Sequence, residues 1–170
     1  MSIYNNLLGF FTYKQNKYFY LSIILFSIIA MAYAFFVEYI LGFEPCILCL
    51  YQRIPYFILV ILAIWGASVK NNKHILLLQT IVLFAAICLS AYHTGIERAI
   101  FDPTAKCNMG VKFPEDASLE EIKELLYNAP IATCTVASYK IFRISMTEWN
   151  LIANICLLIG TIIIMRKNNA

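Results

Sequence analysis

The chain has 170 residues, of which 61% are hydrophobic and only 14% charged, and its mean hydropathy is +0.72. A water-soluble domain of this size needs more polar residues to cover its surface, so the composition excludes an ordinary soluble protein and indicates an integral membrane protein. The net charge of +3 is small, and we expect no nucleic-acid partner.

Four long uncharged stretches follow one another along the chain. They are residues 18–37, 54–69, 75–92 and 149–165. Each approaches the roughly 20 residues that a helix needs to cross a bilayer, and none shows the alternation typical of barrel strands. We therefore predict an all-α membrane protein, a single domain with four transmembrane helices at about residues 18–41, 46–69, 75–93 and 149–165.

The first stretch also contains Ala32-Tyr33-Ala34, which imitates the cleavage site of a secretory signal peptide. Its apolar run is longer than the usual signal-peptide core and continues through Phe35 and Phe36. Three further spans follow it. We therefore expect the first helix to be retained in the protein.

Lysine and arginine residues predict the orientation of the helices. Segments 1–17, 70–74 and 166–170 each carry such residues and contain no acid, whereas loops 42–45 and 94–148 hold every acidic residue except Glu38. The positive-inside rule then places both termini in the cytoplasm and the two loops on the outer side.

The six cysteines sort by their predicted location. Cys88 and Cys156 lie within predicted helices, where cysteine commonly serves as a small apolar residue. The remaining four lie in or beside the outer loops, where an oxidising compartment permits disulfides. They allow three pairings, and proximity in the sequence favours Cys46 with Cys49 and Cys107 with Cys134.

The Cys46–Cys49 pair is the strongest chemical signal. A disulfide that closes so short a loop stabilises a fold little, and a CxxC pair is more often a redox couple. If a helix begins with Pro45, both sulfurs lie in its first turn, where free N–H groups favour a thiolate. Arg53 and Tyr56 then share their helix face, and Arg53 is placed to hold an anion beside the sulfur. The alternative is an arginine that extends to the membrane surface.

Two further interpretations of the outer cysteines stay open at this point. They can form inert structural disulfides, which suits Cys107 and Cys134 at the two ends of a long loop. They can also bind zinc, but four-thiolate zinc sites usually combine two CxxC pairs and this chain has one, so we predict no metal site. Within the same loop, Ser118–Tyr127 begins with a capping box and carries an apolar stripe, which predicts a short amphipathic helix.

Several motifs fall in a fixed order along the chain. PCILCLYQR opens the second predicted helix, YHTGIE, FDPTAKC and KFPE follow the third, and ATC and SMTEWNL precede the fourth. In this order, and over essentially the whole chain, they resemble the DsbB family of bacterial inner-membrane disulfide bond formation proteins. One departure is Tyr139, where some members carry tryptophan.

The resemblance implies a thiol oxidase of the bacterial inner membrane with its active cysteines on the periplasmic side. Such a protein reoxidises a periplasmic DsbA-like protein with a thioredoxin fold and passes the electrons to a membrane quinone, ubiquinone or menaquinone. Cys107 is then the residue that the partner's thiol attacks, and Cys134 is its loop mate. Electrons pass from this pair to Cys46 and Cys49.

The resemblance also implies a quinone site. Cys49 is expected to face the quinone, Arg53 to stabilise its negative charge, and His93 to match the histidine that the family carries near the outer end of the third helix. A pocket role and a simple hydrogen-bonding role stay open for His93. The alternatives to this function are a specialised relative with a dedicated dithiol partner, and a membrane protein without enzymatic activity whose cysteines are structural or bind metal.

Overall fold

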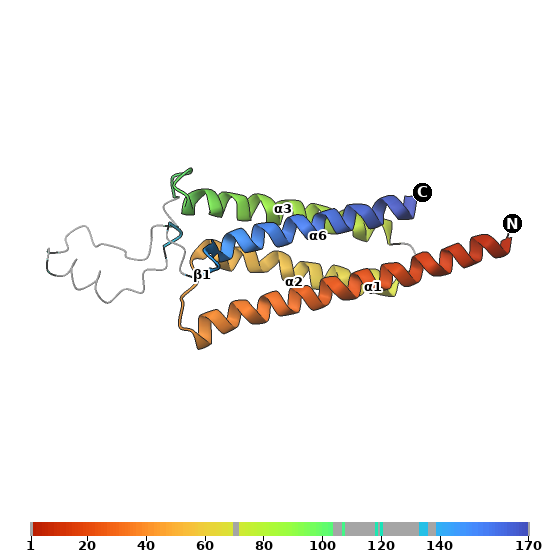
Figure 1. Ribbon diagram of the computed structural model, residues 1–170, viewed down its shortest axis with the longest axis horizontal. Helices are drawn as coiled ribbons and strands as arrows, with labels where there is room; N and C mark the ends of the chain where they lie inside the picture. Colours follow the sequence, from red (N-terminus) through yellow and green to blue (C-terminus); the bar gives the residue numbers. More distant parts are fainter. Residues whose placement is uncertain are drawn as a thin grey trace.

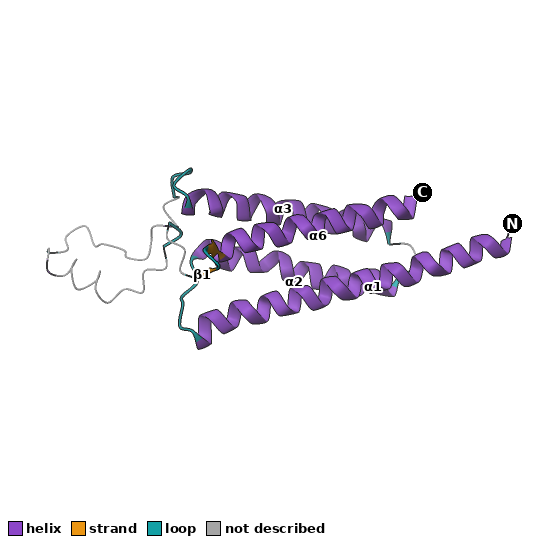
Figure 2. Ribbon diagram, in the orientation of Figure 1, coloured by secondary structure: helices purple, strands orange, loops and turns teal. Residues whose placement is uncertain are grey.

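The computed structural model describes residues 2–69, 72–103, 107, 118, 120, 133–135 and 139–169, with side chains from residue 16 onward. Helices dominate it, and a two-residue-per-strand hairpin precedes the last helix (Figures 1 and 2). The elements are α1 (Ser2–Phe35), the π-helical turn η1 (Phe36–Ile40), α2 (Ile47–Ser68), α3 (Lys73–Glu97), β1 (Lys140–Ile141), β2 (Ile144–Ser145) and α6 (Met146–Asn169).

Within the described part of the chain, four helices are long and apolar enough to cross a membrane, which confirms the predicted four-helix membrane fold. Large apolar side chains such as Ile61, Phe84 and Ile163 are more than half exposed along these helices. In a bilayer this is the expected state, because lipid tails are as apolar as the side chains that face them. The membrane-spanning segments are Asn16–Ile40, Ile47–Ser68, Lys73–Glu97 and Met146–Asn168.

The helices pack as neighbours in a chain of contacts. α1 lies along α2, α2 along α3 and α3 along α6, whereas α1 meets α6 over only a few residues. The core between them holds Tyr20, Leu59, Leu76 and Leu83, all fully buried. Gly66 allows α1 to approach α2 closely, because a Cβ there would lie 2.5 Å from the ring of Tyr20.

The two ends of the bundle differ in character. Both chain termini lie at one end (Figure 1). There the Asn16 side chain donates to Asn168, and Asn168 donates to Asn72, so that three helices are joined by amide hydrogen bonds. The other end carries η1, the start of α2 and the β1–β2 hairpin.

The start of α2 differs from the sequence prediction. The helix begins at Ile47, and Cys46 is its N-cap with extended backbone angles (φ −70°, ψ 167°), so Pro45 precedes the cap instead of opening the helix. The cause is the Cys46 side chain, which accepts the backbone N–H of Cys49. An N-cap side chain can reach that N–H only from an extended backbone.

At the end of the bundle that carries the start of α2, α3 and α6 extend further than the apolar runs. α3 continues to Glu97, and α6 begins at Met146 instead of Trp149. A capping box starts α6: the Ser145 N–H donates to Glu148 (3.0 Å), and the Glu148 N–H donates to the Ser145 hydroxyl (3.2 Å). The helix predicted over residues 118–127 falls outside the described residues, apart from Ser118 and Glu120.

Candidate redox site

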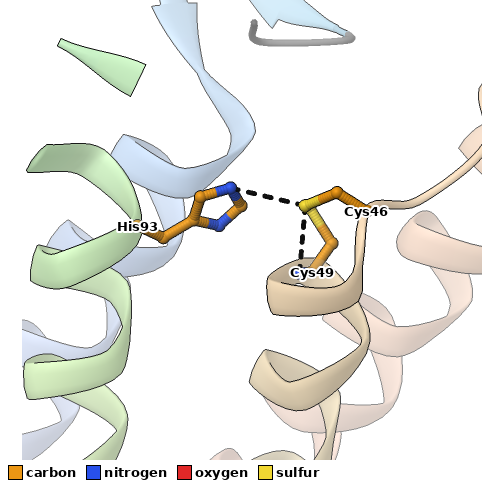
Figure 3. A group of neighbouring side chains, drawn as sticks. All are labelled: Cys46, Cys49 and His93. Carbon is orange, nitrogen blue, oxygen red and sulfur yellow. Dashed lines mark hydrogen bonds between the residues drawn. The ribbon is translucent and has the colours of Figure 1, made fainter. Parts of the chain in front are cut away.

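A pair of thiols lies at the N-terminus of α2. The Sγ atoms of Cys46 and Cys49 are 3.2 Å apart, and the N–H of Cys49 lies 3.4 Å from the Cys46 sulfur (Figure 3). Cys46 is buried, with 3% of its surface exposed. The cap therefore places one sulfur where an acceptor is needed, which favours its thiolate.

His93 reaches the same sulfur from α3. Its Nε2 atom lies 3.4 Å from the Cys46 Sγ, and its ring is fully buried (Figure 3). The ligand atoms of Cys46, Cys49 and His93 all lie within 4.8 Å of one another. This spacing is compatible either with a hydrogen-bonded thiolate or with part of a metal site.

A line of polar side chains continues from His93 into the bundle. Gln52 Nε2 lies 3.0 Å from His93 Nδ1, and Asn150 Nδ2 donates to Gln52 Oε1 at 2.8 Å. The Asn150 carbonyl in turn accepts the Tyr56 hydroxyl (2.5 Å) and the Asn154 amide (3.1 Å). We call Tyr56, Asn150, Gln52 and His93 the amide relay, because two amides join the hydroxyl to the ring.

Glu97 lies one turn beyond His93 along α3, towards the end of that helix. Its Oε1 atom is 4.0 Å from His93 Nε2, and its other oxygen accepts the Thr147 hydroxyl at 2.5 Å. Thr147 also shares a hydrogen bond with Ser145, the cap of α6. The start of α6 is therefore tied to the helix that carries His93.

The two loop cysteines lie beside the dithiol. Cys107 and Cys134 are buried in one apolar cluster with Cys46, Leu48 and Ile96. Cys134 is only 1% exposed. Residues that are far apart in the sequence thus bring all four predicted cysteines to the same end of the bundle.

The surroundings of Cys46 and of Cys134 shift thiol acidity in opposite directions. The neighbouring Cys49 thiol, the His93 ring and the Cys49 N–H lower the pKa of Cys46 well below its ordinary value. By contrast, burial, followed by the nearby Cys107 thiol, raises the pKa of Cys134. Hydrogen-bond donors favour a thiolate, whereas apolar surroundings penalise it.

Arg53 does not stand alone at the membrane edge. Its guanidinium donates to Glu38 of η1 at 2.6 Å and lies 5.0 Å from the centre of the Phe35 ring. The side chains of the pair are only 14% and 20% exposed. The sequence predicted that Arg53 holds an anion beside the sulfur. In the structure, the guanidinium already has a carboxylate partner, Glu38.

A cavity of about 460 Å³ adjoins the dithiol. Its wall is mostly apolar, is contributed by α1, α2, α3 and α6, and includes a few polar groups. An apolar hollow with few convergent polar groups is the usual form of a site for a small organic ring. The polar and sulfur-bearing residues on its wall include Cys46, Cys49, Gln52, Arg53, His93 and Asn150.

The sequence analysis did not single out four residues that belong to this site. Gln52 and Asn150 build the amide relay, Glu38 pairs with Arg53, and Glu97 lies beside His93. A usable signal was present, because polar residues within membrane spans are costly and usually face the interior of the bundle. Their partners, however, could not be read from the sequence.

A four-helix membrane protein with a dithiol at a helix start and buried loop cysteines beside it has the architecture of a membrane thiol–disulfide oxidoreductase. Residues 16–164 match the family model "Disulfide bond formation protein DsbB", and the chain belongs to this family of membrane disulfide bond formation proteins.

Relatives cover nearly the whole chain. "Uncharacterized protein RP370" of Rickettsia prowazekii is 40% identical over 92% of this chain and 94% of its own length. "Disulfide bond formation protein B 1" of Pseudomonas fluorescens is 25% identical over 91% of this chain and 92% of its own length. "Disulfide bond formation protein B" of Vibrio cholerae is 27% identical over 81% of each chain.

Proposed function

We propose that this protein oxidises the dithiol of a periplasmic DsbA-type protein with a thioredoxin fold and delivers the electrons to ubiquinone or menaquinone. The observation that supports this most is the position of Cys46. It shares an apolar cluster with Cys107 and Cys134, it lies 3.2 Å from the Cys49 sulfur, and it lines the cavity.

The first stage is an exchange between proteins. A thiolate of the partner attacks the Cys107 sulfur, which breaks the Cys107–Cys134 disulfide and leaves Cys134 with the electron pair. The partner's second thiol then displaces Cys107. The partner gains a disulfide, and the loop pair gains two electrons and becomes two thiols.

The second stage is an exchange within the protein. Cys134 attacks Cys46 and breaks the Cys46–Cys49 disulfide, and Cys107 then attacks Cys134 and releases Cys46. The loop disulfide forms again, and Cys46 and Cys49 become the reduced pair. The low pKa of Cys46 makes it a good leaving group in the final displacement, because a thiol with a lower pKa leaves faster.

The cavity beside the dithiol is the proposed quinone site. A quinone, when bound, takes up two electrons and two protons and leaves as a quinol. The apolar wall would hold its ring, Arg53 would favour the negative charge that reduction develops, and Cys49 and His93 line the same hollow. Glu38 holds Arg53 in position through a salt bridge and neutralises its charge at the edge of the membrane.

The orientation in the membrane is part of the proposal. The termini lie at the end of the bundle opposite to the start of α2 (Figure 1), and segments 1–17, 70–74 and 166–170 carry lysine and arginine but no acidic residue. We therefore place both termini in the cytoplasm and the dithiol, the hairpin and the loop cysteines on the periplasmic side of the inner membrane.

A reconstituted reaction tests this function. The purified protein is mixed with a reduced DsbA-type protein and a soluble quinone, and quinone absorbance is followed with time. Quinone should be reduced by the parent protein and by a Cys88→Ala control, which removes an exposed cysteine of α3, but not by Cys49→Ala. Quinone left unreduced by the parent protein, with zinc bound one-to-one instead, would contradict the proposal.

A further inference from the structure

We propose that the amide relay holds His93 as an N–H donor to the sulfur of Cys46, which makes Gln52 and Asn150 positioning residues for the Cys46 thiolate. The same dithiol carries the proposed function. The hydrogen-bond arrangement proposed for His93 stands without that function, and only the role of the Cys46 thiolate in electron transfer rests on it. The arrangement gives a task to two membrane-embedded amides that belong to α2 and α6.

Asn150, at the inner end of the relay, sets the direction of its hydrogen bonds. A side-chain amide has a carbonyl that only accepts and an NH₂ group that only donates. The Asn150 carbonyl is occupied by two donors, the Tyr56 hydroxyl and the Asn154 amide. The NH₂ group of Asn150 therefore points the other way, towards the carbonyl of Gln52 at 2.8 Å.

The orientation of the Gln52 amide in turn fixes which nitrogen of the His93 ring accepts a hydrogen bond. Because the Gln52 carbonyl accepts from Asn150, the Gln52 NH₂ group faces His93 Nδ1 at 3.0 Å. Nδ1 must then be the acceptor nitrogen, and in a neutral imidazole the proton lies on the other nitrogen. That nitrogen, Nε2, lies 3.4 Å from the Cys46 sulfur.

Burial gives the relay its strength. His93 is 1% exposed, Tyr56 6%, Gln52 8% and Asn154 0%. Water cannot readily replace a missing partner at such positions, and each unpaired amide group within a membrane is costly. At Gln52 and His93 the donor direction is therefore set by the bundle and not by exchange with solvent, whereas Asn150 is half-buried at the cavity wall.

The relay also selects between the two uses of the close Cys46–Cys49–His93 cluster. A protonated Nε2 donates to a thiolate, but it offers no lone pair to a metal ion. A proton on Nδ1 would instead meet the NH₂ group of Gln52. The neutral ring with a proton on Nε2 is the state that fits, and it supports a hydrogen-bonded thiolate.

Other titratable groups face this sulfur and its histidine, and each belongs to a different part of the site. Cys49 approaches from α2, Glu97 from α3, and Cys107 and Cys134 from the loop, whereas Tyr56 is bonded to Asn150 at the inner end of the relay. Arg53, paired with Glu38, and Glu44 line the adjoining cavity. Glu97 is the strongest competitor for control of the ring, since its carboxylate is 4.0 Å from Nε2.

Nitrogen NMR of the parent protein tests the tautomer directly. The chain has two histidines, so labelling histidine with ¹⁵N and comparing the spectrum with that of His74→Gln assigns His93. The expected result is a neutral ring protonated on Nε2 in the reduced protein. A ring protonated on Nδ1, or on both nitrogens near neutral pH, would overturn the proposal without any question of variant folding.

Alkylation of Cys46 tests the positioning residues. In Asn150→Leu and Gln52→Met, the pH at which the Cys46 alkylation rate levels off should rise by about one unit. At pH values below that inflection, the alkylation rate should then be about tenfold lower than in the parent protein. Tyr56→Phe should shift the inflection less, because the Asn154 amide still donates to Asn150. An unchanged inflection in the first two variants would overturn the proposal.

A matched control separates this effect from simple removal of a buried amide. Gln79 is fully buried in α3, the helix that carries His93, and its amide lacks a hydrogen-bond partner among the described residues. Gln79→Met should leave the Cys46 profile unchanged. Both measurements need neither quinone nor protein partner, so a failure of the proposed function leaves their outcome readable.

Discussion

The two cysteine regions at the dithiol end of the bundle use the same residue type in opposite surroundings. Cys46 caps a helix and receives donors from a backbone amide and, through the amide relay, from His93. Cys134 comes from the long loop and lies in an apolar cluster. The first environment lowers the pKa of its thiol and the second raises it, so neighbours decide the acidity more than the residue does.

This difference bears on the direction of electron flow. A dithiol whose thiolate is stabilised has a more stable reduced form, and its disulfide is therefore a stronger oxidant. The Cys46–Cys49 pair is built in this way, whereas the Cys134 thiol is disfavoured as a thiolate. The contrast supports the proposed transfer of electrons from the loop pair to the helix pair.

The largest expected effect comes from a substitution that disables the loop cysteine pair and leaves the Cys46–Cys49 pair intact. Cys134→Ser should reduce oxidation of a DsbA-type protein to the rate seen without enzyme, because the loop disulfide can no longer form. Quinone reduction with the small reductant dithiothreitol should continue, since that reductant can reach the cavity directly. Equal loss with both reductants would show that the two regions do not act in series.

A second test compares the acidity of the two thiols in the reduced parent protein. The alkylation rate of Cys46 should level off well below the ordinary thiol pKa of about 8.5, and that of Cys134 should still rise above it. At about pH 6.5 an ordinary thiol is only about 1% thiolate, so the thiolate fraction of Cys46 should be roughly 100-fold higher. Peptide mass spectrometry at several pH values measures both rates, and coincident inflections would contradict the comparison.

A third test concerns Arg53, which the proposed function assigns to the helix region. Arg53→Met leaves Glu38 unpaired in a position that is only 20% exposed, and the free energy of unfolding should fall by about 2 kcal/mol. The double variant Arg53→Met/Glu38→Met should regain most of this stability in a detergent unfolding titration.

The same two variants separate the structural role of Arg53 from its role towards the quinone. The apparent KM for quinone should stay raised in both, because each lacks the guanidinium on the cavity wall. A double variant with the parent KM would show that the arginine serves only to neutralise Glu38.

The smallest expected effect lies at the start of α6, which joins the loop to the bundle. Ser145→Ala removes the N-cap hydroxyl and should cost about 1 kcal/mol of unfolding free energy. The Cys46 alkylation profile should not change, since among the described residues Ser145 reaches His93 only through Thr147 and Glu97. A shifted profile would mean that the cap also adjusts the ring.

The fold was largely predictable because membrane spans are recorded locally in the sequence. Runs of apolar residues near the required length indicate the four helices without any knowledge of their neighbours. The predicted bounds differ from the structure at the helix ends, because side chains outside the apolar run determine where each helix begins. The Ser145–Glu148 capping box starts α6 at Met146, and the Cys46 side chain starts α2 at Ile47. The first of these signals was readable in SMTE.

The sequence by itself determined the class of protein, the four spans, and a cysteine pair at the start of a helix, because these depend on residues close together in the chain. Only the tertiary structure decided that Gln52 meets Asn150 and His93, that Arg53 pairs with Glu38, and that Cys134 lies beside Cys46. The physical reason is that spans apolar on all sides do not specify which face turns inward. The rotation of each helix, and with it every long-range polar contact, is set when the helices pack.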